Sequence, residues 1–351
     1  MAQNILITGA AGYIGGSVLS EFLSRTDSPI KATKLSAVVR TEEQAQKLAK
    51  LGVNVIEIDL SDEAAVTNAV LRNEIDMVIH TANSANWQLV SYLIKALGQR
   101  RKVSGKETYF IHSSITTLFS EDGGWPYGQV KDSDPLLFEK DKEIGTAHPA
   151  RKTNILTTEL SKEQGVTSFI ILVPVVYGVG SGEWRKLSVN IPAYTRASIE
   201  RKVVCKFENN GNPPAVHITD LVGLYALMVE KILQKEPIPS GEKGYYFATV
   251  HSAPWWEIMQ RIADVLYARG LVKEPKVQVW PSWEEAADVL GFPRPFIRAI
   301  GSSKGDFVPV NAYQLGWKPQ WDQQRFLNSM EEEVQAVLDL DTIKPTLFAS
   351  T

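Results

Sequence analysis

Three glycines spaced three residues apart, directly after a short apolar run, constrain this chain more than any other feature. Residues Asn4–Thr8 read as a β-strand, and Gly9, Gly12 and Gly15 follow it. At this spacing the first glycine permits a tight turn, the second lets a pyrophosphate approach the backbone, and the third lets the next helix pack closely on the strand. The apolar spacing of residues 12–23 predicts that helix, whose N-terminus attracts phosphate charge. The sequence therefore predicts a dinucleotide-binding turn.

The first half of the chain alternates between strand-like and helix-like segments. Further strands are expected at residues 35–39, 53–58, 77–79, 108–112 and 169–173, and helices at 42–51, 62–71 (capped by Ser61), 87–97 and 147–162. This alternation predicts the α/β class with a doubly wound parallel sheet of the Rossmann type, because right-handed crossovers place helices on both faces. We expect residues 1–178, with a returning segment near 205–228, to form the dinucleotide-binding domain. Residues 179–351 should form mainly a smaller, mixed α/β substrate-binding lobe, and residues 115–146 a long loop.

Composition and charge exclude several kinds of protein. Hydrophobic residues make up 44% and charged residues 22% of the 351 residues, which is an ordinary globular balance. The net charge of −3 argues against nucleic acid as a partner. Cys205 is the only cysteine and the five histidines lack metal-ligand spacing, so neither a disulfide framework nor a metal site is expected. No stretch approaches the roughly 20 apolar residues of a membrane span and no secretory signal is present, so we expect a cytoplasmic protein without membrane contact.

Two further strand ends bear on the choice of cofactor. Arg40 follows the second expected strand, where NAD-binding sites usually carry an acidic residue that holds the ribose 2′-hydroxyl. An arginine there can pair with a 2′-phosphate, which favours NADP(H) and leaves NAD(H) as the alternative. Asp59 follows the third strand and could accept a hydrogen bond from the adenine amino group, with a simple turn aspartate as the competing interpretation.

Six motifs, in order along the chain, resemble those of the extended short-chain dehydrogenase/reductase family in its NAD-dependent epimerase/dehydratase-like branch. They are TGAAGYIG (8–15), Asp59-Leu60, DMVIHTAN (76–83), FIHSS (110–114), LVPVVYG (172–178) and VHITDL (216–221). The resemblance implies a seven-stranded Rossmann core, a C-terminal substrate lobe and a nicotinamide beside a Ser/Tyr/Lys constellation. It also implies cofactor contacts by a set of residues in or near these motifs: Gly9, Gly12, Tyr13, Ile14, Gly15, Leu60, Thr81, Ala82, Lys152 and Pro174.

The resemblance assigns the chemistry to three positions. Ser114 matches the serine that hydrogen-bonds the substrate oxygen. Lys152 matches the lysine that holds the nicotinamide ribose and lowers the pKa of a tyrosine. That tyrosine would stand four residues before the lysine, where this chain has His148. This replacement is the main departure from the family pattern.

Three interpretations of the departure compete. His148 could replace tyrosine as the proton donor, because imidazole titrates near neutral pH and residues four apart share a helix face. Alternatively, Tyr127 could enter the pocket from the long loop, since residues 127–131 are a literal YxxxK. In the third interpretation the family chemistry is lost, and the protein binds cofactor as a regulator or catalyses a non-redox isomerisation or cyclisation.

The substrate is the least constrained part of the prediction. Ser113, Trp184 and His217 are the candidate substrate-pocket residues, although His217 and Asp220 are expected mostly to orient the two lobes. We expect an oxidoreductase of secondary metabolism that acts on a small hydrophobic carbonyl, enone or alcohol. A nucleotide-sugar epimerase or dehydratase is the alternative, because several arginines could bind a pyrophosphate: Arg185, Arg196 and Arg201.

Two expectations concern surfaces. The family often dimerises through paired helices, and here the helices near residues 87–101 and 147–164 would form a homodimer contact. The run Glu331-Glu332-Glu333 is expected to be a solvated helix face rather than a pair of catalytic acids.

Overall fold

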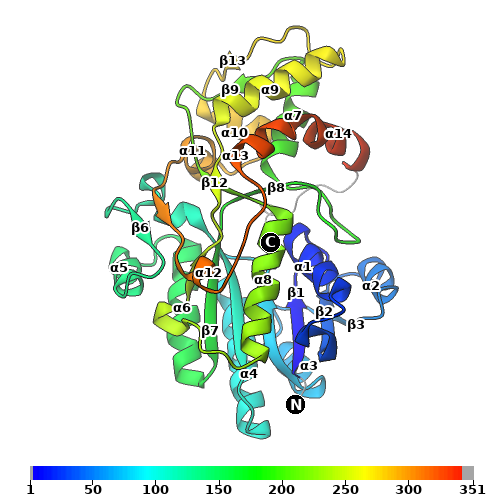
Figure 1. Ribbon diagram of the computed structural model, residues 1–351, viewed down its shortest axis with the longest axis vertical. Coiled ribbons are helices and arrows are strands. Elements are labelled where there is room, and N and C mark those ends of the chain that lie inside the picture. Colours follow the sequence, from blue (N-terminus) through cyan, green and yellow to red (C-terminus); the bar gives the residue numbers. More distant parts are fainter. Residues whose placement is uncertain (1–2, 342–351) are drawn as a thin grey trace.

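A seven-stranded parallel sheet forms the lower part of the molecule in Figure 1. The computed structural model describes residues 3–341, so the ends of both expected domains, 1–2 and 342–351, lie outside the described residues. The strand order is β11-β7-β5-β4-β1-β2-β3, and each neighbouring pair is parallel. The strands are β1 (Asn4–Thr8), β2 (Lys34–Val39), β3 (Asn54–Glu57), β4 (Ile75–His80), β5 (Tyr109–Ile115), β7 (Thr167–Val173) and β11 (Tyr245–Phe247). The predicted α/β, Rossmann-type fold class is confirmed.

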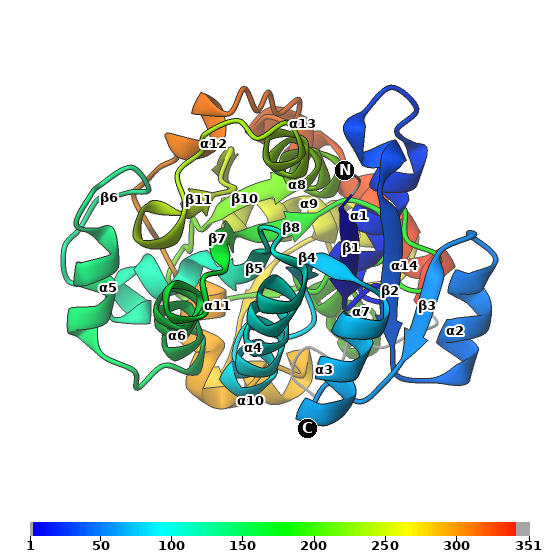
Figure 2. The same cartoon turned by 90° about the horizontal axis from the view of Figure 1, so that it is seen from below.

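Helices cover both faces of this sheet (Figure 2). One face carries α1 (Tyr13–Ser24) and α8 (Ile218–Leu233), and the other carries α3 (Glu63–Arg72), α4 (Trp87–Ser104) and α6 (Pro149–Gln164). Alternate residues along each strand point to opposite faces, so Ile5 and Ile7 pack under α1 while Leu6 packs under α3 and α4. The remaining helix, α2 (Glu42–Ala49), joins β2 to β3. The sheet also takes β11 from beyond the segment 205–228 that was expected to return to it.

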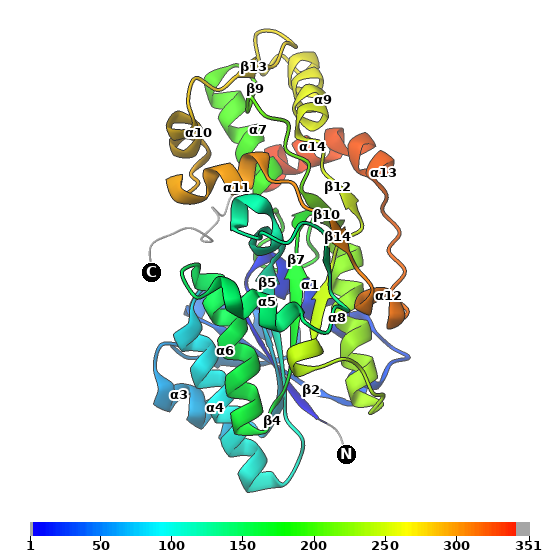
Figure 3. The ribbon, with the colours of Figure 1, turned by 90° about the vertical axis from the view of Figure 1, so that its left-hand side faces the viewer.

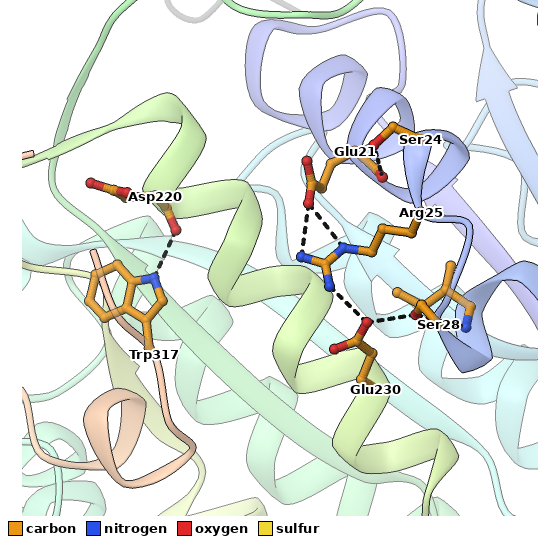
Figure 4. A network of polar contacts seen from close by, with 8 residues as sticks. Glu21, Ser24, Arg25, Ser28, Asp220, Glu230 and Trp317 are labelled. Carbon is orange, nitrogen blue, oxygen red and sulfur yellow. Dashed lines mark hydrogen bonds and ion pairs between the residues drawn. The ribbon is translucent and has the colours of Figure 1, made fainter. Parts of the chain in front are cut away.

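An ion-pair network ties α1 to α8 (Figure 4). The guanidinium of Arg25 reaches Glu21 one turn earlier and Glu230 of α8, with its Nη1 2.7 Å from the Glu230 carboxylate. Ser28 donates to the same oxygen of Glu230 at 2.6 Å. These side chains are only partly exposed, so the network is better shielded from solvent than a surface ion pair. It joins the helix of the glycine turn to a helix more than 200 residues later.

The C-terminal part forms a second layered body above the carboxyl ends of the strands (Figure 1, Figure 3). Its core is a separate cluster that includes Tyr194, Trp255 and Phe326. Its helices are α7 (Asn190–Arg201), α9 (Trp255–Ala268), α10 (Trp283–Leu290), α11 (Ile297–Ser302), α13 (Gln323–Asn328) and α14 (Met330–Leu340). Small sheets join β8 (Val175–Tyr177), β10 (Pro214–His217) and β12 (His251–Ser252), and pair β9 (Cys205–Lys206) with β13 (Gln278–Val279).

The expected long loop at residues 115–146 is partly regular. It contains β6 (Val130–Lys131), which pairs with β14 (Phe307–Val308), and α5 (Leu137–Ile144), while α12 (Asn311–Gln314) lies nearby. A buried ion pair holds α5 in place, because Arg151 of α6 lies 2.8 Å from the carboxylate of Asp141. The pattern missed this helix because its stability depends on that distant partner rather than on local spacing.

The expected helix boundaries need small corrections. Asp62, not Ser61, caps α3, because its carboxylate accepts the backbone N–H groups of Ala64 and Ala65. Helix α4 runs on to Ser104, and α6 begins at Pro149 rather than at 147. The second change matters for the site, because it leaves His148 outside the helix.

Candidate functional site

The turn between β1 and α1 has no room for side chains at its glycines. Gly9 has a φ of +74°, and a Cβ there would lie 2.9 Å from the backbone of Ala82. A Cβ on Gly15 would lie 2.3 Å from Thr81 Oγ1. Gly12 stands at the N-cap of α1 without a side-chain cap, so the first N–H groups of the helix are left for another acceptor. This cradle fits a dinucleotide pyrophosphate, whose charge the helix N-terminus favours.

Neighbouring residues hold the turn in this shape. Thr81 Oγ1 donates to the carbonyl of Thr8 at 2.7 Å, which joins the ends of β4 and β1. The hydroxyl of Tyr13 is buried and donates to the carbonyl of Gly178 at 2.7 Å. Ile14 packs against the core under α1, and Leu60 packs on the opposite face. Tyr13 therefore fixes the start of α1 to Gly178, and its hydroxyl already has a protein partner.

Arg40 and Asp59 lie at the ends of β2 and β3 as expected. Arg40 is exposed, and within residues 3–341 no ion pair within 4.0 Å holds its guanidinium. Asp59 accepts the N–H of Ser61 at 2.9 Å, and this hydrogen bond, helped by the nearby charge of Arg40, lowers the pKa of the Asp59 carboxyl. An unpaired guanidinium at this edge is available to an anionic ligand.

The two serines at the end of β5 face opposite sides of the sheet. Ser113 lies 2.6 Å from the buried hydroxyl of Tyr225 in α8, so it points away from α6. Ser114 is 2% exposed, and its Oγ has no hydrogen-bond partner among the described residues. Because strand residues alternate, Ser114 faces the side covered by α4 and α6. The structure thus separates the candidate pair and leaves Ser114 facing the helix that carries Lys152.

Lys152 lies in the first turn of α6 beside an aromatic ring. Its Nζ stands 3.9 Å from the ring centroid of Trp87, the first residue of α4. Such a cation–π contact positions an ammonium while leaving its N–H groups free to donate. Trp87 is 36% exposed. Sequence reasoning missed it, because a tryptophan at the start of an amphipathic helix has no signal of its own.

His148 caps α6 instead of lying within it. The backbone N–H of Ala150 donates to its Nδ1 at 3.2 Å, so the remaining proton of the neutral ring is on Nε2. Burial, assisted by the charge of Arg151, lowers the pKa of His148. Its ring packs against Phe296, with centroids 5.4 Å apart. As the N-cap, His148 has an extended rather than helical backbone, and its carbonyl accepts the N–H of Lys152.

Tyr127 lies on the surface of the 115–146 segment. Its side chain is 39% exposed, and its hydroxyl donates to Glu143 of α5 at 2.7 Å. That carboxylate raises the pKa of the Tyr127 hydroxyl. The tyrosine is therefore placed beside α5 rather than beside Ser114.

The remaining candidates lie along the junction of the two parts. Trp184 lies under Lys47 of α2, with Nζ 4.5 Å from the ring, and the nearby Gly182 lies against Gly16 of α1. His217 caps α8 and stacks on Trp321 at 3.8 Å. Asp220 accepts the N–H groups of Gln320 and Trp321. Pro174 is buried between β7 and β8.

Glu333 corrects the expected solvated glutamate run. It is 7% exposed and accepts the N–H of Gly178 at 2.6 Å, and burial raises the pKa of its carboxyl to about 7. Met330, Val334 and Val337 share its buried face at helical spacing. That spacing was a readable signal that Glu333 faces inward.

Neither a metal-binding cluster nor a membrane-spanning helix occurs among residues 3–341. Within residues 3–341, no cluster of three or more histidine, cysteine or acidic side chains has an arrangement that could hold a metal ion. The helices of the same range include none with the length and apolar character needed to cross a membrane.

Comparisons with known proteins agree with this geometry. Residues 5–97 match the family described as the NAD dependent epimerase/dehydratase family. A Schizosaccharomyces pombe protein, uncharacterized protein C2A9.02, is 26% identical over 327 residues, covering 90% of this chain and 95% of that protein. The oxidase ucsJ of an Acremonium species is 23% identical over 312 residues, covering 82% of this chain and 85% of the oxidase.

Solved structures share the fold over nearly the whole length. The UDP-glucose 4-epimerase of Bifidobacterium longum, in complex with NAD+ and UDP, superposes with a TM-score of 0.65 at 16% identity. The alignment covers 97% of this chain and 100% of the epimerase.

Proposed function

We propose that this chain, whose residues 5–97 match the NAD dependent epimerase/dehydratase family, is an extended short-chain dehydrogenase/reductase and an NADP(H)-dependent oxidoreductase. Its substrate would be a small hydrophobic carbonyl, enone or alcohol. The observation that carries the proposal is the arrangement at the start of α6. Ser114 near the end of β5, His148 at the N-cap of α6 and Lys152 in the first turn of α6 all belong to segments at the carboxyl edge of the sheet. Within residues 3–341, the Ser114 hydroxyl lacks a protein partner.

Different residues of the chain would bind different parts of the cofactor. The N-terminus of α1 would hold the pyrophosphate, Arg40 would pair with a 2′-phosphate, and Lys152 would donate to the nicotinamide ribose. When bound, the nicotinamide supplies or accepts the hydride. Arg40 supports the choice of NADP(H) because an arginine rather than a carboxylate stands directly after β2, where NAD-binding sites hold the ribose 2′-hydroxyl.

His148 would act on the substrate oxygen as a neutral donor. A neutral imidazole at a helix N-terminus can polarise a carbonyl through its N–H without carrying a charge. The lowered pKa of His148 and the occupied Nδ1 both favour that form at neutral pH. His148 therefore replaces the hydrogen bond of the family's tyrosine, but the proton itself must come from another group.

The surroundings of His148 support a hydrophobic substrate. Phe296 of the C-terminal part packs against His148 and is 37% exposed, while Trp87 lies against the ammonium of Lys152 and is 36% exposed. Large aromatic faces left open beside polar groups are typical of sites for flat apolar ligands.

Isothermal titration with NADPH, NADH, NADP and NAD tests the proposal. We expect the phosphorylated forms to bind more tightly, and Arg40→Ala to weaken only them by about 10- to 100-fold, as for the loss of one charge-assisted contact. Arg72→Ala, which removes an exposed arginine at the end of α3, is the matched control. Equal binding of NAD(H) and NADP(H) by the unaltered protein would contradict the role of Arg40.

A nucleotide-sugar epimerase or dehydratase is the second candidate, and Arg185 favours it. This side chain is partly buried, its Nη2 has no partner within the described residues, and the charge of Arg196 adds to burial in lowering its pKa. Two neighbouring guanidinium groups could hold a diphosphate. Conversion of UDP-glucose without net oxidation of NADPH would favour this candidate over the first.

A further inference from the structure

A row of buried polar groups without protein partners lies behind Ser114. Within residues 3–341, the unpartnered atoms include both ring nitrogens of His112, the Ser114 hydroxyl, both amide atoms of Asn154, and the hydroxyls of Thr158 and Ser161. Each of these residues is at most 2% exposed. Native proteins rarely leave such groups unsatisfied, so a cluster of them needs a physical explanation.

The fold brings these residues to one interface. His112 and Ser114 are alternate residues of β5 and therefore face the same side of the sheet, the side that α6 covers. Asn154, Thr158 and Ser161 follow at i, i+4 and i+7 along α6, which is one stripe of the helix. Helix α6 runs antiparallel to β5, as the return of a parallel crossover requires, so Asn154 lies towards the carboxyl end of β5.

The row continues to the opposite edge of the sheet. Thr108 precedes β5, is fully buried, and its hydroxyl also has no partner among residues 3–341. Two consecutive residues join it to the end of the helical stripe: Val166 donates to the carbonyl of Ser161 at 2.8 Å, and Thr167 donates to the carbonyl of Thr108 at 2.9 Å. The polar atoms thus extend along the whole length of the β5–α6 interface.

A dry interface of this composition would be strongly unfavourable. Each buried donor or acceptor without a partner costs more than a typical hydrogen bond contributes to stability. The other threonines of α6 avoid this cost, since Thr153 and Thr157 donate to backbone carbonyls one turn earlier. Ordered water is the usual partner of buried polar groups that cannot reach protein atoms.

We infer that a file of ordered water molecules occupies the β5–α6 interface and returns a proton to the Ser114 hydroxyl during catalysis. This inference rests on the proposed oxidoreductase function. Reduction of a carbonyl adds a hydride to carbon and one proton to oxygen. Ser114 gives its hydroxyl proton to that oxygen and takes one from the first water, and each following member passes a proton on, so the net proton comes from solvent.

His112 is the member best suited to pass a proton along such a file. A neutral imidazole accepts a proton at one ring nitrogen and releases one from the other. Its neighbour His80 cannot do so, because Thr8 occupies its Nδ1 at 2.7 Å and the carbonyl of Asn83 its Nε2 at 3.1 Å. The rings of His80 and His112 stack at 5.6 Å, and within residues 3–341 neither ring nitrogen of His112 has a partner. His112 is thus a positioning residue that acts through Ser114.

A high-resolution crystal structure of the unaltered protein tests the water file without any substrate. We expect ordered water within hydrogen-bond distance of His112, Asn154 and Thr158. Thr158→Val keeps the side-chain shape and should displace the water at that position. Thr157→Val is the matched control, because Thr157 is buried in the same helix but donates to Thr153. A dry interface, with these side chains bonded to one another, would overturn the inference.

Kinetics test the proton path. With NADPH and an aromatic aldehyde as the probe substrate, His112→Phe should lower kcat at least about tenfold and enlarge the solvent deuterium isotope effect, with KM for NADPH unchanged. Thr158→Val should act in the same direction if His112→Phe does not fold. An unchanged kcat and isotope effect in a folded variant would refute the path. If the unaltered protein reduces nothing, the proposed function and the path both fail, whereas the water file is judged by the crystal structure alone.

Discussion

The cofactor turn and the start of α6 lie at the same edge of one sheet but follow opposite rules. At the turn, the backbone defines the region: a Cβ has no space at Gly9 or Gly15, and no side chain caps the first N–H groups of α1. At the start of α6, side chains define the region: His148 caps the helix, and the ammonium of Lys152 lies against the ring of Trp87. The comparison teaches that a region shaped by backbone can be recognised from residue spacing, whereas a region shaped by side-chain contacts cannot.

Placing a side chain in the cofactor turn should have the largest effect, because it removes the space that distinguishes this region from the start of α6. Gly15→Val places side-chain atoms where Thr81 Oγ1 and the carbonyl of Gly9 already lie within 2.4 Å of a Cβ. We expect NADPH affinity to fall at least about 100-fold, because backbone and phosphate can no longer approach. Gly223→Ala in α8, where a Cβ meets nothing within 4 Å, is the control and should bind normally. Retention of affinity in Gly15→Val would place the pyrophosphate elsewhere.

Glu333 contacts Gly178, which also accepts from Tyr13 of the cofactor turn, and should give a pH-dependent stability. Its pKa is about 7 in the fold, above its ordinary value of 4.5, so the folded state binds the proton more tightly than the unfolded chain. The stabilisation is full below pH 4.5 and is lost as the pH rises to about 7, with a size of up to about 3 kcal/mol. Glu333→Gln keeps an acceptor for Gly178 N–H and should remove this dependence.

Chemical denaturation of Glu333→Gln and the unaltered protein between pH 5 and 8 measures the effect. The difference in unfolding free energy should shift towards the variant from pH 5 to about 7 and then level off. Glu331→Gln changes an exposed glutamate of the same helix turn and is the control. Parallel stability curves for all three proteins would show that Glu333 is not held protonated.

Two replacements of His148 separate its structural and chemical contributions. His148→Asn retains a side chain that can cap α6, whereas His148→Ala removes the cap and should cost about 1 kcal/mol of unfolding free energy. Both variants lose the Nε2–H donor, so both should lower kcat, by about tenfold for a lost neutral hydrogen bond. Full activity in His148→Asn would show that capping is the residue's only contribution.

Much of the fold was readable from the sequence because it rests on local patterns. The expected strands and helices of the first half occur, most with boundaries shifted by a few residues, although α4 runs on to Ser104. Hydrophobic periodicity predicts such elements better than it predicts their ends. The misses share one cause. Helix α5 depends on the buried pair of Arg151 and Asp141, and Ser113 is directed away from Ser114 by Tyr225, which lies more than 100 residues later.

By itself, the sequence determined the doubly wound sheet and the glycine turn, because a missing Cβ and an alternating pattern act within a few residues of the chain. Only the tertiary structure decided which polar groups have partners. It paired Tyr127 with Glu143, placed His148 at a helix cap and buried Glu333 beside Gly178. It also left His112 and Asn154 without a partner among residues 3–341. Hydrogen bonds and burial depend on atoms that converge from distant segments, so no local pattern could have determined them.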